Sequence, residues 1–214
     1  PVHCEVVTWS PELSSIPSST LKGADAVINL AGEGIADGRW SNERKNKIIQ
    51  SRVISTRQLI KAMTYMNDKP EVFVSASAIG FYGDRGDELL NESSSNGEGF
   101  LSQVCRSWEE EINKAKALRI RTVSLRIGMV LGHDGGALEK MLPPFQLGVG
   151  GKLGSGSQWM SWIHIEDLVN MMVYAVENSS VNGEYNAVSP TPVKNIEFTK
   201  TLGQVLKRPT IFPV

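Results

Sequence analysis

The sequence is poor in cysteine: only Cys4 and Cys105 occur among 214 residues, far apart and without metal-ligand spacing. A disulfide framework or a zinc site is therefore not expected. No apolar run approaches the length of a membrane-spanning helix, and the N-terminus has no signal-peptide pattern. We therefore expect a soluble, cytoplasmic protein with no membrane partner.

A charge excess of either sign is also missing. The 22 basic and 23 acidic residues are interspersed and leave a net charge of −1, so electrostatics give no reason to expect nucleic acid or an anionic membrane as partner.

A phosphate-binding loop is absent as well. The glycine-rich run GVGGKLGSG at 148–156 has Leu153 after Lys152, where such a loop needs Ser or Thr, and it follows a predicted helix instead of a strand.

Apolar residues make up 41% of the chain, enough for one large α/β domain or for one domain with a small appendage. Residues 25–31 (DAVINLA) and the start of residues 72–84 (VFVSASAIGFYGD) are predicted as buried strands. A strand covered by helices on both faces is apolar throughout, and its C-terminal end borders the crevice where open α/β sheets bind ligands. We therefore expect the functional site at the ends of these strands.

Small hydroxyl residues occupy the end of the second strand. Ser75 and Ser77 would let a flat ligand approach closely and would offer it hydrogen bonds. The alternative is that both serines only pack tightly under a neighbouring helix.

Several helices are predicted around these strands. Ser41 is a good N-cap, with Glu43 in the first turn, for a long basic helix that ends near Met66. A second apolar face at helical spacing predicts a helix over residues 100–118. Residues 1–9 are predicted to contain a further strand.

The run SASAIGFYGD resembles the strand-5 motif of extended short-chain dehydrogenases/reductases, in which a Ser-rich strand end precedes a Tyr-Gly pair, here Tyr82–Gly83. The longer run is similar to an atypical branch labelled "epimerase family" or NAD-dependent epimerase/dehydratase-like, some members of which carry the label of cell-division inhibitors. The resemblance implies an α/β, Rossmann-like doubly wound parallel sheet in residues 1–147. It also implies a small mixed substrate-binding portion in residues 148–214, interleaved with the last strands of the sheet.

The resemblance implies NADP as cofactor, with NAD left open. It places Leu30, Ala31 and Gly32 beside the adenosine and pyrophosphate, the alternative being an ordinary strand-to-helix turn. Lys47 and Arg52 would lie beside the cofactor phosphate or ribose, the alternative being a solvated helix surface. Arg52 is the stronger candidate, because a guanidinium can fork onto a phosphate.

Other residues are carried over as neighbours of the ligands. Ser75, Val130 and Gly128 would border the cofactor, although simple strand packing also explains them. Trp159 and Trp162 would line the substrate pocket, for which we expect a small carbonyl or hydroxyl compound. A hydrogen-bonded core histidine is predicted at position 164.

The catalytic residues depart from the family pattern. Active members place a Tyr, and four residues later a Lys that lowers the Tyr pKa, at the start of the helix predicted over 100–118. The registers available here are Phe100/Val104, Leu101/Cys105 and Ser102/Arg106. Ser77 keeps its place in the motif, so it is the candidate for hydrogen bonding to the reacting oxygen. Tyr82 is a candidate acid/base, and the alternative is a structural tyrosine in the turn.

Family members carry a glycine-rich strand–turn–helix before the present start and more of the substrate domain after the present end. We expect the natural protein to possess the missing strand, because without it the strand at residues 25–31 exposes an apolar edge and dinucleotide binding is weak. Two hypotheses stay open: an NAD(P)-dependent oxidoreductase or epimerase, and a dinucleotide-binding regulator without turnover. A homodimer is also left open.

Overall fold

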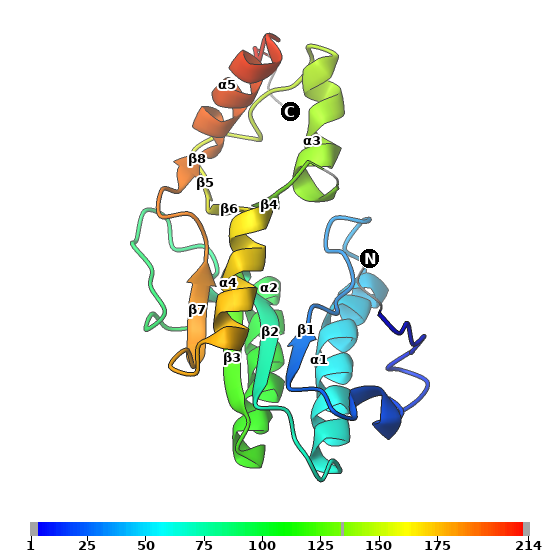
Figure 1. The fold of residues 1–214 in the computed structure, drawn as a ribbon. Coiled ribbons are helices and arrows are strands. Elements are labelled where there is room, and N and C mark those ends of the chain that lie inside the picture. The colour runs from blue at the N-terminus through cyan, green and yellow to red at the C-terminus, as the bar shows by residue number, and fades with distance from the viewer. Residues whose placement is uncertain (1–3, 134, 212–214) are drawn as a thin grey trace.

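A computed structural model describes residues 4–133 and 135–211. Its central feature is a parallel sheet of four strands in the order β1-β2-β3-β7 (Figure 1). The strands span Ala26–Asn29 (β1), Val72–Ala78 (β2), Arg121–Ile127 (β3) and Gly183–Ala187 (β7). Parallel neighbours need crossover connections, which the chain makes through helices. The predicted α/β class with a parallel sheet is confirmed.

Helices cover both faces of this sheet. On one face, α1 (Asn42–Thr64) and α2 (Phe100–Ile112) bury an apolar cluster that contains Met63, Phe73 and Trp108. On the other face, α4 (Ile165–Glu177) packs over Val74 and Leu125 (Figure 1). This covering on both sides explains why β2 reads as a continuous apolar run in the sequence.

The long helix follows its sequence signals closely. The Ser41 side chain accepts a hydrogen bond from the Arg44 backbone N–H at 3.2 Å and caps α1, as predicted. The helix predicted over 100–118 is shorter, because its last turns tighten into a 3-10 helix, η3 (Asn113–Leu118). Two further 3-10 helices are η1 (Ser18–Leu21) and η2 (Ile79–Tyr82).

A small lobe stands beyond the C-terminal ends of the sheet strands (Figure 1). It consists of α3 (Gly136–Gln146), β5 (Trp159–Met160), β8 (Val193–Lys194) and α5 (Asn195–Leu206). Between lobe and sheet lies the parallel pair of β4 (Met129–Leu131) and β6 (Trp162–His164). Residues 148–211 therefore contribute to both parts, since β7 completes the sheet and α4 covers one of its faces.

The N-terminal part differs from the sequence prediction. The strand predicted in residues 1–9 falls partly on residues 1–3, outside the described part, and residues 4–9 form no strand. A strand needs a neighbour for its backbone hydrogen bonds, and no strand in the described part of the chain pairs with this segment. At the sheet edge, β1 leaves Ile28 46% exposed, which agrees with the expected apolar edge. Within the described residues, no helix has the length and apolarity to cross a membrane.

Candidate functional site

Most of the predicted site residues lie at or just after the ends of neighbouring strands, and Lys47 and Arg52 lie on α1. Because the strands are parallel, their C-terminal ends lie together at the end of the sheet that faces the small lobe (Figure 1). Asn29 pairs with Ser75 in the register, and Ala78 pairs with Ile127. The segment after β1, the end of β2 and the segment after β3 therefore lie side by side.

Arg52 and Gly32 touch at the end of β1. A Cβ atom built on Gly32 would lie 3.0 Å from Cζ of Arg52, so the guanidinium packs directly against the glycine backbone. The guanidinium donates to the Ile48 carbonyl at 3.0 Å and lies 5.2 Å from the ring centroid of Trp108. Gly32 and Arg52 were both predicted from the sequence as neighbours of the cofactor, and the structure brings them into contact.

The Arg52 guanidinium is short of an anionic partner. In the described part of the chain, no carboxylate lies within ion-pair distance of it. Burial lowers the pKa of Arg52 below its ordinary value. A desolvated cation with spare N–H donors at a strand end is suited to bind an anion, and its fork geometry matches phosphate.

The segment after β1 is fixed by a residue that sequence reasoning missed. Asn29 is buried, and its Oδ1 accepts from the Ala31 backbone N–H at 3.2 Å. Its Nδ2 donates to Thr56 Oγ1 at 2.9 Å and to Ser75 Oγ at 3.3 Å. An asparagine within an otherwise apolar strand was the available signal. Beyond it, Leu30 is 58% exposed and faces away from the core.

Ser77 is tied to a buried ion pair. Its hydroxyl donates to Glu109 Oε1 at 2.7 Å, and the serine is only 3% exposed. Glu109 on α2 receives two hydrogen bonds from Arg126 on β3, from Nε to Oε1 and from Nη2 to Oε2, both at 2.9 Å. Burial disfavours the charged form of Arg126, but its hydrogen bonds to Glu109 and Tyr82 outweigh burial and raise its pKa.

Tyr82 belongs to the same network. Its phenol donates to Asn186 Oδ1 at 2.6 Å and accepts from Arg126 Nη1 at 3.0 Å, and the side chain is buried. Arg126 also lies 3.6 Å from the ring centroid of Phe81. Glu109, Arg126 and Asn186 were not singled out from the sequence, although an arginine in a buried strand needs a partner and could have been noticed.

The remaining predicted cofactor residues are not gathered with Arg52. Lys47 is 59% exposed, and its ammonium pairs with Glu43 at 2.9 Å. It points about 140° away from Arg52 around the helix, as five residues of helical rotation require. Ser75 is fully buried inside the sheet. Val130 lies half-buried in β4 with Ile163 as its register partner.

Two further side chains bear on acid/base chemistry. Cys105 occupies one register of the missing Tyr/Lys pair, but burial raises its pKa to about 11. His164 is exposed and caps α4, with its Nδ1 accepting from the Glu166 backbone N–H at 3.3 Å. The predicted core position of His164 is wrong, because the strand ends there and the side chain turns to the helix terminus.

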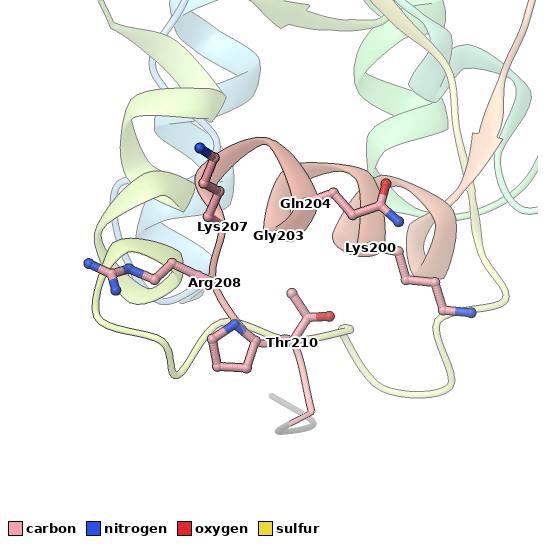
Figure 2. A pocket seen from close by; sticks show the side chains of 7 residues that line it. Lys200, Gly203, Gln204, Lys207, Arg208 and Thr210 are labelled. Carbon is pink, nitrogen blue, oxygen red and sulfur yellow. The ribbon is translucent and has the colours of Figure 1, made fainter.

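A cavity of about 310 Å³ lies elsewhere, at the far end of the small lobe. Its lining includes Lys200, Lys207 and Arg208, but Figure 2 shows these three side chains pointing in different directions. Cations that diverge do not form a common anion site. None of the predicted site residues lines this cavity. The described residues also contain no group of three metal-ligating side chains.

Comparison with sequence families gives one match over most of the chain. Residues 12–188 match the model described as "NAD dependent epimerase/dehydratase family". Epimerase family protein ML0860 of Mycobacterium leprae is 36% identical over 210 residues, covering 98% of this chain and 68% of that protein. The chloroplastic SDR39U1 homolog of Arabidopsis thaliana is 44% identical over 196 residues, covering 91% and 56%. The chain thus spans 56% to 68% of the length of these two relatives.

Solved structures share the fold. The human epimerase family protein SDR39U1 (isoform 2), solved with NADPH, has a TM-score of 0.84 at 35% identity, covering 94% of this chain and 68% of that one. A nucleoside-diphosphate sugar epimerase from Corynebacterium glutamicum has a TM-score of 0.78 at 36% identity, covering 96% and 44%. UDP-glucuronic acid 4-epimerase from Bacillus cereus, at 19% identity and a TM-score of 0.79, agrees in fold alone. The predicted Rossmann-like fold is confirmed.

Proposed function

Because the chain belongs to the NAD dependent epimerase/dehydratase family, we propose that it is an NADP-dependent oxidoreductase or epimerase acting on a small carbonyl or hydroxyl compound. Family membership supports a nicotinamide dinucleotide as cofactor. The human relative was solved with NADPH, and the more distant Bacillus cereus enzyme was solved with NAD. The NADP preference and the substrate class belong to the proposal.

The contact between Arg52 and Gly32 carries this proposal. The guanidinium is desolvated, lacks a carboxylate partner in the described chain, and lies at the end of β1 where ligands of α/β sheets bind. Gly32 has no side chain, so a flat ligand can approach its backbone beside the guanidinium. These features fit a dinucleotide phosphate held by Arg52, with Leu30 and Ala31 along the adenosine.

The chain's own residues would bind and orient the cofactor as follows. Arg52 would fork onto a phosphate while Trp108 and the Ile48 carbonyl hold its guanidinium in place. Asn29 would keep the turn after β1 in position through the Ala31 N–H. When bound, a nicotinamide dinucleotide supplies hydride transfer to or from a substrate carbon.

The test is a titration of the full-length protein with NADPH and with NADH, followed by nicotinamide fluorescence. Charge-assisted hydrogen bonds contribute about 1.5–3 kcal/mol, so Arg52→Gln should weaken NADPH binding roughly 10- to 100-fold. Arg57→Gln is the matched control, since Arg57 lies on the same helix but pairs with Glu111. Equal affinity of wild type and Arg52→Gln would overturn the proposed site.

A second candidate function is a dinucleotide-binding regulator without turnover. The observation that favours it is that both candidate hydroxyls already donate hydrogen bonds within the protein. Ser77 donates to Glu109, and Tyr82 donates to Asn186. Hydride exchange with a panel of sugars and carbonyl compounds separates the two candidates. Tight NADPH binding with no turnover on any compound would favour the regulator.

A further inference from the structure

Two side-chain contacts join the small lobe to the sheet domain on different strand-end loops. The first involves Asp87, in the segment between η2 and α2. Its carboxylate accepts from Trp159 Nε1 at 2.6 Å and lies 3.5 Å from the Lys194 ammonium. Trp159 and Lys194 are direct cross-strand partners in the lobe, on β5 and β8, with the ammonium 4.9 Å from the indole ring centroid. We name this group the Asp87 contact.

The second contact involves Asp37, in the segment between β1 and α1. Its carboxylate forms an ion pair with Lys140 on α3 of the lobe, across 103 residues of sequence. On the sheet side, Arg44 holds the same segment through an ion pair with Glu33. We name the pair of Asp37 and Lys140 the Asp37 contact.

Both aspartates stand on segments that are anchored to the sheet domain. The segment that carries Asp87 is held at Glu92, whose carbonyl accepts from Arg126 and whose carboxylate accepts from the Asn186 backbone N–H. The segment that carries Asp37 is held at Glu33, whose backbone N–H donates to Ser51 Oγ at 2.9 Å. The sheet domain thus presents two exposed carboxylates on anchored segments, and the lobe presents the partners.

The lobe partners favour the charged form of both carboxylates. The hydrogen bond from Trp159 and the charge of Lys194 lower the pKa of Asp87, and Lys140 lowers the pKa of Asp37. The chain passes between sheet domain and lobe only three times after β3: from β4 to α3, from β5 to β6, and from β7 to β8. These connections and the β4–β6 pair hold the base of the lobe, and the Asp87 and Asp37 contacts tie it further out to the strand-end loops.

We propose that the Asp87 and Asp37 contacts together hold the small lobe over the strand ends, and that their breaking sets the rate at which a bound dinucleotide leaves. This inference rests on the proposed function for the identity of the ligand. The positions of the two contacts support it. Asp37 lies on the segment between β1 and α1, which also contains Gly32, and Asp87 lies on the segment that follows η2 at the end of β2. A lobe held at both loops closes over the ligand position between them.

The first experiment tests the coupling of the two contacts without any ligand. The chain contains five tryptophans, and 5-fluorotryptophan labelling gives each a fluorine resonance, with Trp159 assigned from its loss in Trp159→Phe. Lys140→Met removes the charge on the Asp37 side and touches neither Trp159 nor Asp87. We expect Lys140→Met to shift or broaden the Trp159 resonance, because under the proposal both contacts hold the same lobe. An unchanged Trp159 resonance would overturn the proposal.

The second experiment measures release of NADPH by stopped-flow displacement from the full-length protein. Exposed ion pairs are individually weak, so Asp87→Ala with Lys140→Met should speed release about three- to tenfold, and each single variant should do less. Glu110→Ala is the matched control, because it removes an exposed pair with Arg106 on α2, away from the lobe. Thermal melting confirms that each variant is folded.

The outcomes separate this inference from the proposed function. A responsive Trp159 resonance with faster NADPH release supports the inference. A responsive resonance with unchanged release overturns the link between the contacts and ligand exit. A wild-type protein that does not bind NADPH overturns the proposed function, and the Trp159 resonance in Lys140→Met still decides whether the two contacts hold one rigid lobe.

Discussion

Arg126 and Glu109 form a bidentate ion pair beneath the end of β2, with both N···O distances at 2.9 Å. Both side chains are almost wholly buried. The pair connects β3 to α2, and through Ser77 and Tyr82 it also fixes the end of β2 and the turn that follows. It therefore stabilises the segment that borders the candidate site.

The first prediction concerns the stability that this pair gives. Removal of one partner of a buried ion pair leaves an uncompensated charge, so Glu109→Ala should lower the free energy of unfolding by about 3–5 kcal/mol. The measurement is urea unfolding followed by circular dichroism. Glu109→Leu combined with Arg126→Met should recover much of the loss, since no charge is then left buried. The contrary result is a double variant whose loss of unfolding free energy equals the sum of the losses in Glu109→Leu and in Arg126→Met.

The second prediction concerns the contact of Gly32 with Arg52. Gly32→Ala places a methyl group 3.0 Å from Cζ of Arg52, so the guanidinium must shift by a few tenths of an ångström from its position against the glycine. We expect NADPH affinity to fall by about tenfold, with little change in the melting temperature. In the Arg52→Gln background, the same Gly32→Ala change should cost less, because only its direct effect on the approach of the ligand to the backbone is left. Fully additive losses would show that the glycine acts independently of the arginine.

The third prediction concerns the two thiols. Cys4 is exposed, whereas Cys105 is buried and its pKa is raised to about 11. Because the thiolate is the reactive form, Cys105 stays protonated and inert at neutral pH. Titration of the native protein with a thiol reagent at pH 8 should therefore label one cysteine per chain rapidly. Cys4→Ser should abolish that rapid phase, and rapid labelling of Cys105 in this variant would contradict the structure.

The fourth prediction concerns Asn29, the buried amide at the end of β1. Asn29→Leu removes the acceptor for the Ala31 N–H and the amide that donates to the Ser75 hydroxyl. The Thr56 hydroxyl also loses this donor but keeps the Trp108 indole N–H at 3.0 Å. We expect the free energy of unfolding to fall by about 1–3 kcal/mol, as unsatisfied buried polar groups require. Chemical denaturation measures it. Asn29→Asp tests the same position with an acceptor that cannot donate.

Local signals in the sequence predicted much of the fold. The apolar run of β2 and the N-cap Ser41 each depend on residues that are close together in the chain, and both predictions hold. The contact of Arg52 with the turn after β1 also involves residues that are near each other in the sequence, because α1 is the helix that follows β1. The cofactor-binding role proposed for Arg52 and for this turn came from the resemblance to a family.

The polar network could not be predicted in the same way. Ser77 meets Glu109 across 32 residues, and Tyr82 meets Asn186 across 104 residues. Such partners depend on the order of strands in the sheet and on the rotation of α2, which hydrophobic patterns do not specify. Lys47 shows the same limit, since the basic character of α1 does not tell which side chain faces the strand end.

The account depends most directly on the position of the dinucleotide. A crystal structure of the full-length protein with bound NADPH tests it in one measurement. We predict a phosphate oxygen at about 2.7–2.9 Å from the Arg52 guanidinium, with the adenosine along Leu30 and Ala31. A dinucleotide bound away from the end of β1, with Arg52 free of phosphate, would contradict the central claim.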